Sequence, residues 1–217
     1  MSEFVPTNRT GVVRHPERAI YDRQRIYSIL DEAFICHVGY VIERQPFVIP
    51  MVYGRSGDRI FLHGSALSRT LCSLAEGIDA CVTVTLVDGL VLARSAFRHS
   101  INYRSVVILG KARPVTDPAE KFEALQCVTN HVATGRWDEV RQPDEAEMTS
   151  TGVLVMPLNE VSAKSRSGFP IDLERDLSLP VWAGVIPVRM ELGEPVADTH
   201  VPVDVPVVDK NKFTRST

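Results

Sequence analysis

The sequence predicts a mainly β fold with inserted helices, in which about six antiparallel strands form a closed or nearly closed barrel with flanking helices. Three observations lead to this prediction. Several strand-length segments are rich in β-branched and aromatic residues. Short turns join the first of these segments, as in antiparallel hairpins. Helical spacing of apolar residues is limited to three segments, and a barrel leaves no strand edge exposed.

The N-terminal half begins with a helix and continues with hairpins. Residues 22–33 are predicted to form an amphipathic helix, because their apolar residues recur at helical spacing and Asp22 can act as its N-cap. Strands follow at residues 34–42 and 47–53, joined by the turn Glu-Arg-Gln-Pro. A second turn, Ser-Gly-Asp, leads into a strand at residues 59–63.

The rest of the chain alternates between helices and strands. Its elements are expected to be a helix at 68–76, a long strand at 80–93 with a turn or bulge at Asp88-Gly89, a strand at 103–112, a helix at 117–133 opened by Asp117 and Pro118, a loop or short helix at 136–151, a strand at 152–164, a surface loop at 165–180 and a last strand at 182–192. No repeat or composition shift divides the chain. We therefore expect a single domain over residues 1–217, with an N-terminal arm at 1–18 and an extended tail at 199–217.

Composition narrows the function classes. The net charge is −3, with 44% hydrophobic and 24% charged residues, so neither nucleic acid nor an anionic membrane is an expected partner. The four cysteines form no Cys-x-x-Cys pair and accompany no histidine cluster, which argues against zinc and favours buried, reduced thiols. The sequence begins with no secretory signal and has no membrane-spanning stretch, so a cytoplasmic location is expected.

Small polar residues and an arginine stand where the strand at 59–63 meets the next helix. Ser65, Ser68, Arg69 and Thr70 surround the expected helix N-terminus. Free N–H groups, the helix dipole and a guanidinium there favour a phosphate monoester. The alternative is a simple cap, in which Ser68 closes the helix and nothing binds. No Walker A or Gly-x-Gly-x-x-Gly pattern is present, so a nucleoside triphosphate is not supported.

His63 ends the strand before this turn and also has two interpretations. It is either a histidine satisfied within the core or the barrel rim, or a group facing the same cavity as the phosphate. In the second case it would donate to a cofactor or substrate oxygen near neutral pH.

These segments and their order resemble a known family. The sequence contains ILDEA, PFVIPMVY, IFLHGSALSRTL, NYRSVVILGKA and LPVWAGVIPVRMELGEPVAD, in that order. The chain resembles, over about residues 18–198, the flavin-nucleotide-binding proteins related to pyridoxamine 5′-phosphate oxidase, and among them the nitroimidazole-resistance proteins. The resemblance implies a six-stranded split β-barrel that binds FMN at the interface of a homodimer.

The resemblance also implies roles for particular residues. Ser68, Arg69 and Thr70 correspond to the FMN phosphate site, and His63 corresponds to the active-site histidine of the nitroimidazole-resistance branch. Residues 48–52 line the isoalloxazine ring and ribityl chain, and Ser105 replaces a flavin-contacting glutamine. The residues of that strand assigned to the cofactor are Ile49, Pro50, Met51 and Val52.

Three departures from the family pattern argue against vitamin B6 oxidation. The phosphate motif is Ser-Arg-Thr where the oxidases have Ser-Arg-Lys, so either FMN binding is weaker or another cation, such as Arg104 or Lys164, supplies the missing charge. Leu192 stands where the oxidases have a flavin-contacting tryptophan, and their Arg-x-His motif is not recognisable. Trp182 is either a residue packed near the flavin or a core or interface tryptophan.

Three function hypotheses follow. The first is an FMN-dependent oxidoreductase that passes electrons to a small acceptor such as a nitro-aromatic or a quinone, with His63 as its catalytic residue. The second is a non-catalytic carrier that binds a flavin or haem in the same barrel, and the third is a dimer without a cofactor. FAD, a deazaflavin and haem are the alternatives to FMN. The expected partners are a small-molecule substrate and a second copy of the chain.

Overall fold

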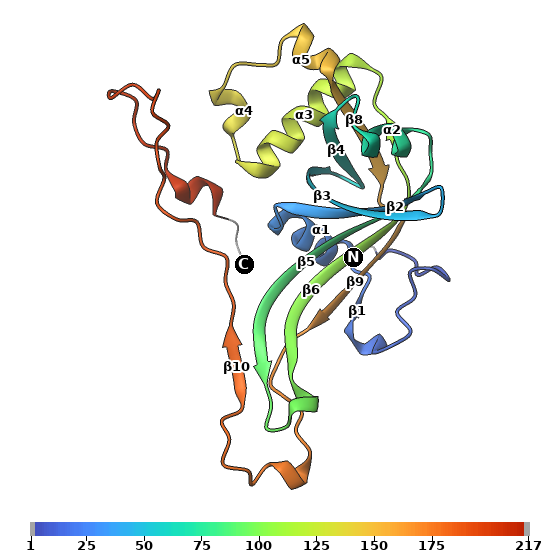
Figure 1. The fold of residues 1–217 in the computed structure, drawn as a ribbon, viewed down its shortest axis with the longest axis vertical. Coiled ribbons are helices and arrows are strands. Elements are labelled where there is room, and N and C mark those ends of the chain that lie inside the picture. The colour runs from blue at the N-terminus through green and yellow to red at the C-terminus, as the bar shows by residue number, and fades with distance from the viewer. Residues whose placement is uncertain (1–2, 215–217) are drawn as a thin grey trace.

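The computed structural model describes residues 3–214 and confirms the mainly β fold with flanking helices (Figure 1). Within these residues the strands are β1 (Ala19–Ile20), β2 (Ile35–Ile42), β3 (Gln45–Ser56), β4 (Arg59–Ser65), β5 (Asp79–Leu92), β6 (Ser100–Lys111), β7 (Arg113–Pro114), β8 (Thr151–Pro157), β9 (Glu160–Arg166) and β10 (Gly184–Pro187). The α-helices are α1 (Arg23–Glu32), α2 (Arg69–Ala75), α3 (Pro118–Val132), α4 (Arg136–Glu139) and α5 (Glu145–Ser150). Four 3₁₀ turns are η1 (Pro16–Arg18), η2 (Ala96–Arg98), η3 (Glu174–Asp176) and η4 (Lys210–Phe213). The expected arm and tail extend into residues 1–2 and 215–217, which lie outside the described part of the chain.

Local signals account for most element boundaries. The side chains of Asp22, Ser68 and Asp117 each accept a hydrogen bond from the backbone N–H three residues later, which caps the three predicted helices. In the β2–β3 turn, Glu43 and Arg44 have φ of 48° and 70°. Two positive φ angles in a two-residue turn match the twist of the flanking strands and set the hairpin register.

The strands follow the order β1-β9-β6-β5-β2-β3-β4-β8-β7, and β10 pairs with β5. β3 belongs to both halves of this sheet, because Val52 still pairs with Ile35 on β2 whereas the next residue, Tyr53, pairs with Leu62 on β4. β8 and β9 follow one another in sequence but pair with β4 and β6 respectively. The barrel is therefore split into two half-sheets joined through β3.

Two strand predictions were wrong. The single strand expected at 152–164 is two strands, because the chain turns at Leu158, whose N–H donates to the Asp58 carbonyl 2.8 Å away. The strand expected at 182–192 is reduced to Gly184–Pro187, which pairs with the end of β5. Beyond Pro187, the described residues up to Asp209 form no further strand, and η4 follows them.

The bulge expected near Asp88-Gly89 is present, as a register shift between Val87 and Gly89 where β5 pairs with β6.

Two apolar clusters hold the sheet. The larger one fills the barrel, and the smaller one lies between α3 and the outer side of β4 and β8. α3 packs closely enough that a Cβ at Gly54 would lie 2.8 Å from the Val128 backbone nitrogen. Glycine at this position therefore permits the close approach of helix and strand.

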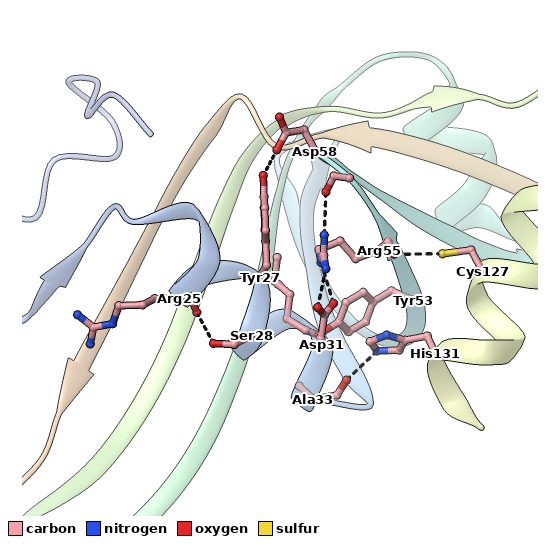
Figure 2. A network of polar contacts seen from close by, with 12 residues as sticks. Arg25, Tyr27, Ser28, Asp31, Ala33, Tyr53, Arg55, Asp58, Cys127 and His131 are labelled. Atoms are coloured by element: carbon pink, nitrogen blue, oxygen red, sulfur yellow. Dashed lines mark hydrogen bonds and ion pairs between the residues drawn. The ribbon is translucent and has the colours of Figure 1, made fainter. Parts of the chain in front are cut away.

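A polar network fastens the C-terminus of α1 to the rest of the barrel (Figure 2). The Tyr53 hydroxyl donates to the Leu30 carbonyl, and His131 Nε2 on α3 lies 2.8 Å from the Ala33 carbonyl. Arg55 on β3 binds Asp31 through two nitrogens. The last carbonyls of a helix have no partner within the helix, so these donors stabilise its end.

The cysteines are all reduced in the structure. Cys36 is buried and Cys81 and Cys127 are half-buried, as expected, but Cys72 is exposed on α2. Among residues 3–214, no helix is both long and apolar enough to cross a bilayer.

Candidate functional site

The candidate site begins where β3 and β4 separate. The last residue pair between them is Tyr53 with Leu62. One residue further, Val52 continues along β2 while His63 continues along β8, opposite Val153. The two strands therefore form a fork, with Val52 and His63 as the first residues of its two branches.

His63 lies on the same side of β4 as Phe61, in a small apolar environment. Phe61 and Val153 belong to the cluster beneath α3, and Val52 packs against that cluster. Nδ1 of His63 is buried and has no hydrogen-bond partner among residues 3–214. Burial also lowers the pKa of His63 below its ordinary value of 6.5, so the imidazole is neutral at pH 7. A neutral, unpaired imidazole can act as a hydrogen-bond acceptor, a donor or a metal ligand.

The strand expected to line the cofactor presents alternate residues to opposite sides. Ile49 and Met51 pack against the barrel core. Pro50 and Val52 face outward with Val48, whose side chain is 65% exposed. Alternation along a strand allows only every second residue to face one ligand, so only Pro50 and Val52 share the outer face with the fork.

The polar residues before α2 make a compact turn. Ser65 Oγ accepts from the Leu67 N–H at 3.3 Å, and Ser68 Oγ accepts from the Leu71 N–H at 3.2 Å. Because each hydroxyl acts as acceptor, its own hydrogen can still be donated outward. Thr70 Oγ1 lies 2.8 Å from the Tyr40 hydroxyl, which connects the helix to the barrel.

Arg69 is the available cation of this turn. Its guanidinium lies over the Phe47 ring, 4.4 Å from the ring centroid. No ion pair engages it within residues 3–214, whereas many other arginines of the chain are paired with carboxylates. An exposed arginine held by a ring and left without an acid can bind an anion.

Arg104 does not join the site. Its side chain points to the core side of β6, where Nη2 lies 2.8 Å from Glu32 Oε1 and 2.7 Å from Asp88 Oδ1. These two hydrogen-bonded carboxylates, Glu32 first, raise the pKa of Arg104. An arginine held by two acids cannot supply the charge that the phosphate motif lacks.

The remaining predicted residues are dispersed. Ser105 lies on the outer face of β6 and donates to the Lys164 carbonyl at 3.4 Å. Lys164 Nζ donates to the Arg14 carbonyl of the N-terminal arm at 2.7 Å. Trp182 is 63% exposed and covers Gly184, where a Cβ would lie 2.9 Å from the ring. The structure thus brings together His63, Ser65 and Val52, and leaves Lys164 and Trp182 elsewhere.

The sequence reasoning missed one histidine of the outer sheet face. His37 on β2 lies between Pro50 on β3 and Thr83 on β5, and it is exposed. The alternation along the strand could have revealed it, because His37 lies between the apolar Cys36 and Val38, which are buried, and so must face the opposite side of the sheet. His37 and His63 differ from His131, whose ring is hydrogen-bonded to a backbone carbonyl.

The donors in the fork suit a planar redox cofactor. A haem can be held by a neutral histidine in an apolar pocket, which His63 and its neighbours would supply. A flavin phosphate needs hydroxyl donors and a cation, which Ser68 and Arg69 supply. The orphaned Nδ1 of His63 is the observation on which this fit depends.

A comparison with protein-family models identifies one family for this chain. The family model described as pyridoxamine 5′-phosphate oxidase matches residues 22–165. A comparison with curated proteins found no match.

Three solved structures are similar to the chain. The flavocytochrome Anf3 from Azotobacter vinelandii is 38% identical, with a TM-score of 0.91, over 98% of this chain and 100% of that one. The FAD and heme binding protein from Mycobacterium smegmatis is 31% identical, with a TM-score of 0.87, over 91% and 98%. A protein from Bacteroides thetaiotaomicron assigned to 5-nitroimidazole antibiotic resistance is 26% identical, with a TM-score of 0.58, over 67% and 85%.

Proposed function

Because the chain belongs to the pyridoxamine 5′-phosphate oxidase family, we propose that it is a redox protein that binds both a flavin and a haem. The observation that carries this proposal is the buried, unpaired Nδ1 of His63 at the fork between β3 and β4. The similarity to a flavocytochrome and to an FAD- and haem-binding protein, each over nearly the whole chain, supports it.

The flavin phosphate is assigned to the turn before α2. Arg69 binds this phosphate, and Ser68 donates a hydroxyl hydrogen to the same group. FAD is preferred to FMN, because the similar M. smegmatis protein binds FAD and because the Ser-Arg-Thr turn offers only one cation to a terminal phosphate.

His63 would hold the haem. A flavin takes part in two-electron transfers and a haem in one-electron transfers, so a protein that holds both could couple the two kinds of reaction. His63 contributes a neutral nitrogen at the position where both branches of the fork are apolar, and Phe61 and Val153 exclude water from it. A dry surround of this kind would tune the reduction potential of a haem held there.

A second copy of the chain is proposed to complete the site. The outer face of β2, β3 and β5 exposes Ile35, Val41, Val48 and Val87 by 44–65%. An exposed apolar sheet face of this kind is typical of an interface. The unpaired thiols are typical of a reducing compartment, so we also propose a cytoplasmic location.

Reduction of a small nitro-aromatic or quinone acceptor is the second candidate. The similarity to the nitroimidazole-resistance structure favours it, although that likeness covers only 67% of this chain. A carrier without turnover remains the alternative. Oxidation of reduced protein by each acceptor, followed at the flavin absorbance, separates the two.

The test is a titration of cofactor-free protein with FAD and with haem. Wild-type protein is expected to take up both, and His63→Ala is expected to keep FAD and to lose the wild-type ligand-field spectrum of the haem. His37→Ala, the other histidine on this sheet face, is the control and should leave that spectrum unchanged. If His37→Ala abolishes the spectrum while His63→Ala does not, the assignment of His63 is wrong.

A further inference from the structure

The tip of the β5–β6 hairpin carries arginines that neither the core nor the fork explains. Arg94 follows β5, and its Nη1 lies 2.8 Å from Asp172 Oδ2, while its backbone N–H donates to Oδ1 at 3.0 Å. The Asp172 side chain is only 2% exposed. This one acid, brought in by the loop after β9, neutralises one arginine of the tip.

Burial opposes the shift, but the hydrogen bonds from Arg94 and the charges of Arg94 and Arg98 lower the pKa of Asp172, so the same acid also faces Arg98. Arg98 ends η2, and its guanidinium makes no hydrogen bond or ion pair with residues 3–214. The Nε atoms of Arg94 and Arg98 are both buried without a partner, and with Nδ1 of His63 they are the three buried unpaired side-chain nitrogens of the described residues. Native proteins pair such atoms, so two orphans at one hairpin tip indicate a missing partner.

Arg166 adds a buried charge next to the same loop. It is 8% exposed, and its nitrogens donate to the Asn102 side-chain oxygen and, at 3.1 Å, to the Phe169 carbonyl. These partners are neutral. Burial, and after it the charge of Arg18, lowers the pKa of Arg166. A buried cation that only neutral groups contact is costly unless an anion compensates it.

Flat apolar side chains stand beside these cations. Phe97, which precedes Arg98, is 91% exposed, and Phe169 is 77% exposed. Exposed aromatic rings next to guanidinium groups suit a ligand that combines a planar ring with oxyanions. The adenylyl half of FAD and the haem both have this chemistry.

We propose that Arg98, with Arg94 beside it, binds an oxyanion of the protein's cofactor: a phosphate of the adenylyl half of FAD or a propionate of haem. The inference rests on the proposed function. Figure 1 places this tip at the far end of β5 and β6 from β4. An FAD whose flavin phosphate is held by Arg69 therefore reaches it only on the second copy of the proposed dimer, which would then contribute Arg98 to the site.

The test compares three cofactors on two variants of the full chain. Dissociation constants for FMN, FAD and haem are measured on wild-type protein, on Arg98→Gln and on a control, Arg175→Gln. Arg175 lies on the same loop as Asp172, but its side chain is 82% exposed. Thermal melting verifies that each variant is folded, and because Arg98 makes no hydrogen bond or ion pair with residues 3–214, its replacement should not unfold the protein.

Arg98→Gln is expected to raise the dissociation constant of at least one cofactor about tenfold, which is the loss typical of a charge-assisted hydrogen bond. Weaker FAD with unchanged FMN identifies a phosphate, and weaker haem with unchanged flavins identifies a propionate. Arg175→Gln should change none of the three. The inference is overturned if all three constants stay within about twofold of wild type, or if FMN and FAD weaken equally. If wild-type protein binds neither flavin nor haem, the proposed function itself fails and this inference fails with it.

Discussion

Replacement of His63 by leucine should separate a functional histidine from a structural one. Nδ1 of His63 is buried without a partner, next to Phe61 and Val153. An unsatisfied buried polar group costs about 1–3 kcal/mol, and an apolar side chain of similar shape does not carry this cost. His63→Leu should therefore leave the unfolding free energy of cofactor-free protein unchanged or raise it by about 1–2 kcal/mol. For a chain of this size, that is a rise in Tm of about 2–8 °C.

His131→Leu is the matched control, because it removes a histidine whose partner is known. His131 Nε2 bonds the Ala33 carbonyl at 2.8 Å, and its ring contacts Tyr53. Loss of that hydrogen bond and contact should lower the unfolding free energy by about 1–3 kcal/mol. Urea denaturation of cofactor-free protein measures both variants. If His63→Leu destabilises the protein as much as His131→Leu does, His63 is an ordinary core histidine and the reasoning is refuted.

Three further predictions follow from the same contacts. Because burial depresses the pKa of His63, protonation of this group should not affect the free energy of unfolding above pH 6.5 and should lower it as the pH falls from 6.5 toward the folded-state pKa, and an NMR titration of the imidazole locates that pKa; a midpoint above 6.5 would contradict it. Arg104→Gln leaves two carboxylates without their cation and should cost about 2–3 kcal/mol in urea denaturation with unchanged flavin affinity; weaker flavin binding in a stable variant would return Arg104 to the site. In native protein a thiol reagent should modify exposed Cys72 first and not Cys36, because burial raises the pKa of Cys36 to about 12; mass spectrometry of the labelled peptides identifies which cysteine reacts.

Local chemistry made most of the fold predictable. Caps at Asp22, Ser68 and Asp117 and the bulge near Gly89 are signals carried by a few adjacent residues, and the structure contains each of them. The strand at 152–164 was mispredicted because its break depends on Asp58, about a hundred residues earlier in the chain. No local pattern records a hydrogen bond of that separation.

The turn of the candidate site could be predicted from the sequence, but the side chains that tertiary structure brings to it or keeps from it could not. The motif from His63 to Thr70 is contiguous, so its residues lie close together in any fold. Arg104 was expected to support the phosphate, but only the register of β6 shows that it faces the barrel core and Glu32. The hairpin-tip arginines were missed for the same reason, since Asp172 and Arg94 are brought together by tertiary structure alone.

The visible spectrum of the protein, purified without added cofactor, tests the central claim most directly. We expect the absorbance of an oxidised flavin together with the Soret band of a haem, and mass spectrometry of the released chromophores should identify FAD and haem. A colourless protein that takes up neither cofactor on incubation would contradict the claim. The segment from His63 to Thr70 would then be no more than a strand end and a capped turn.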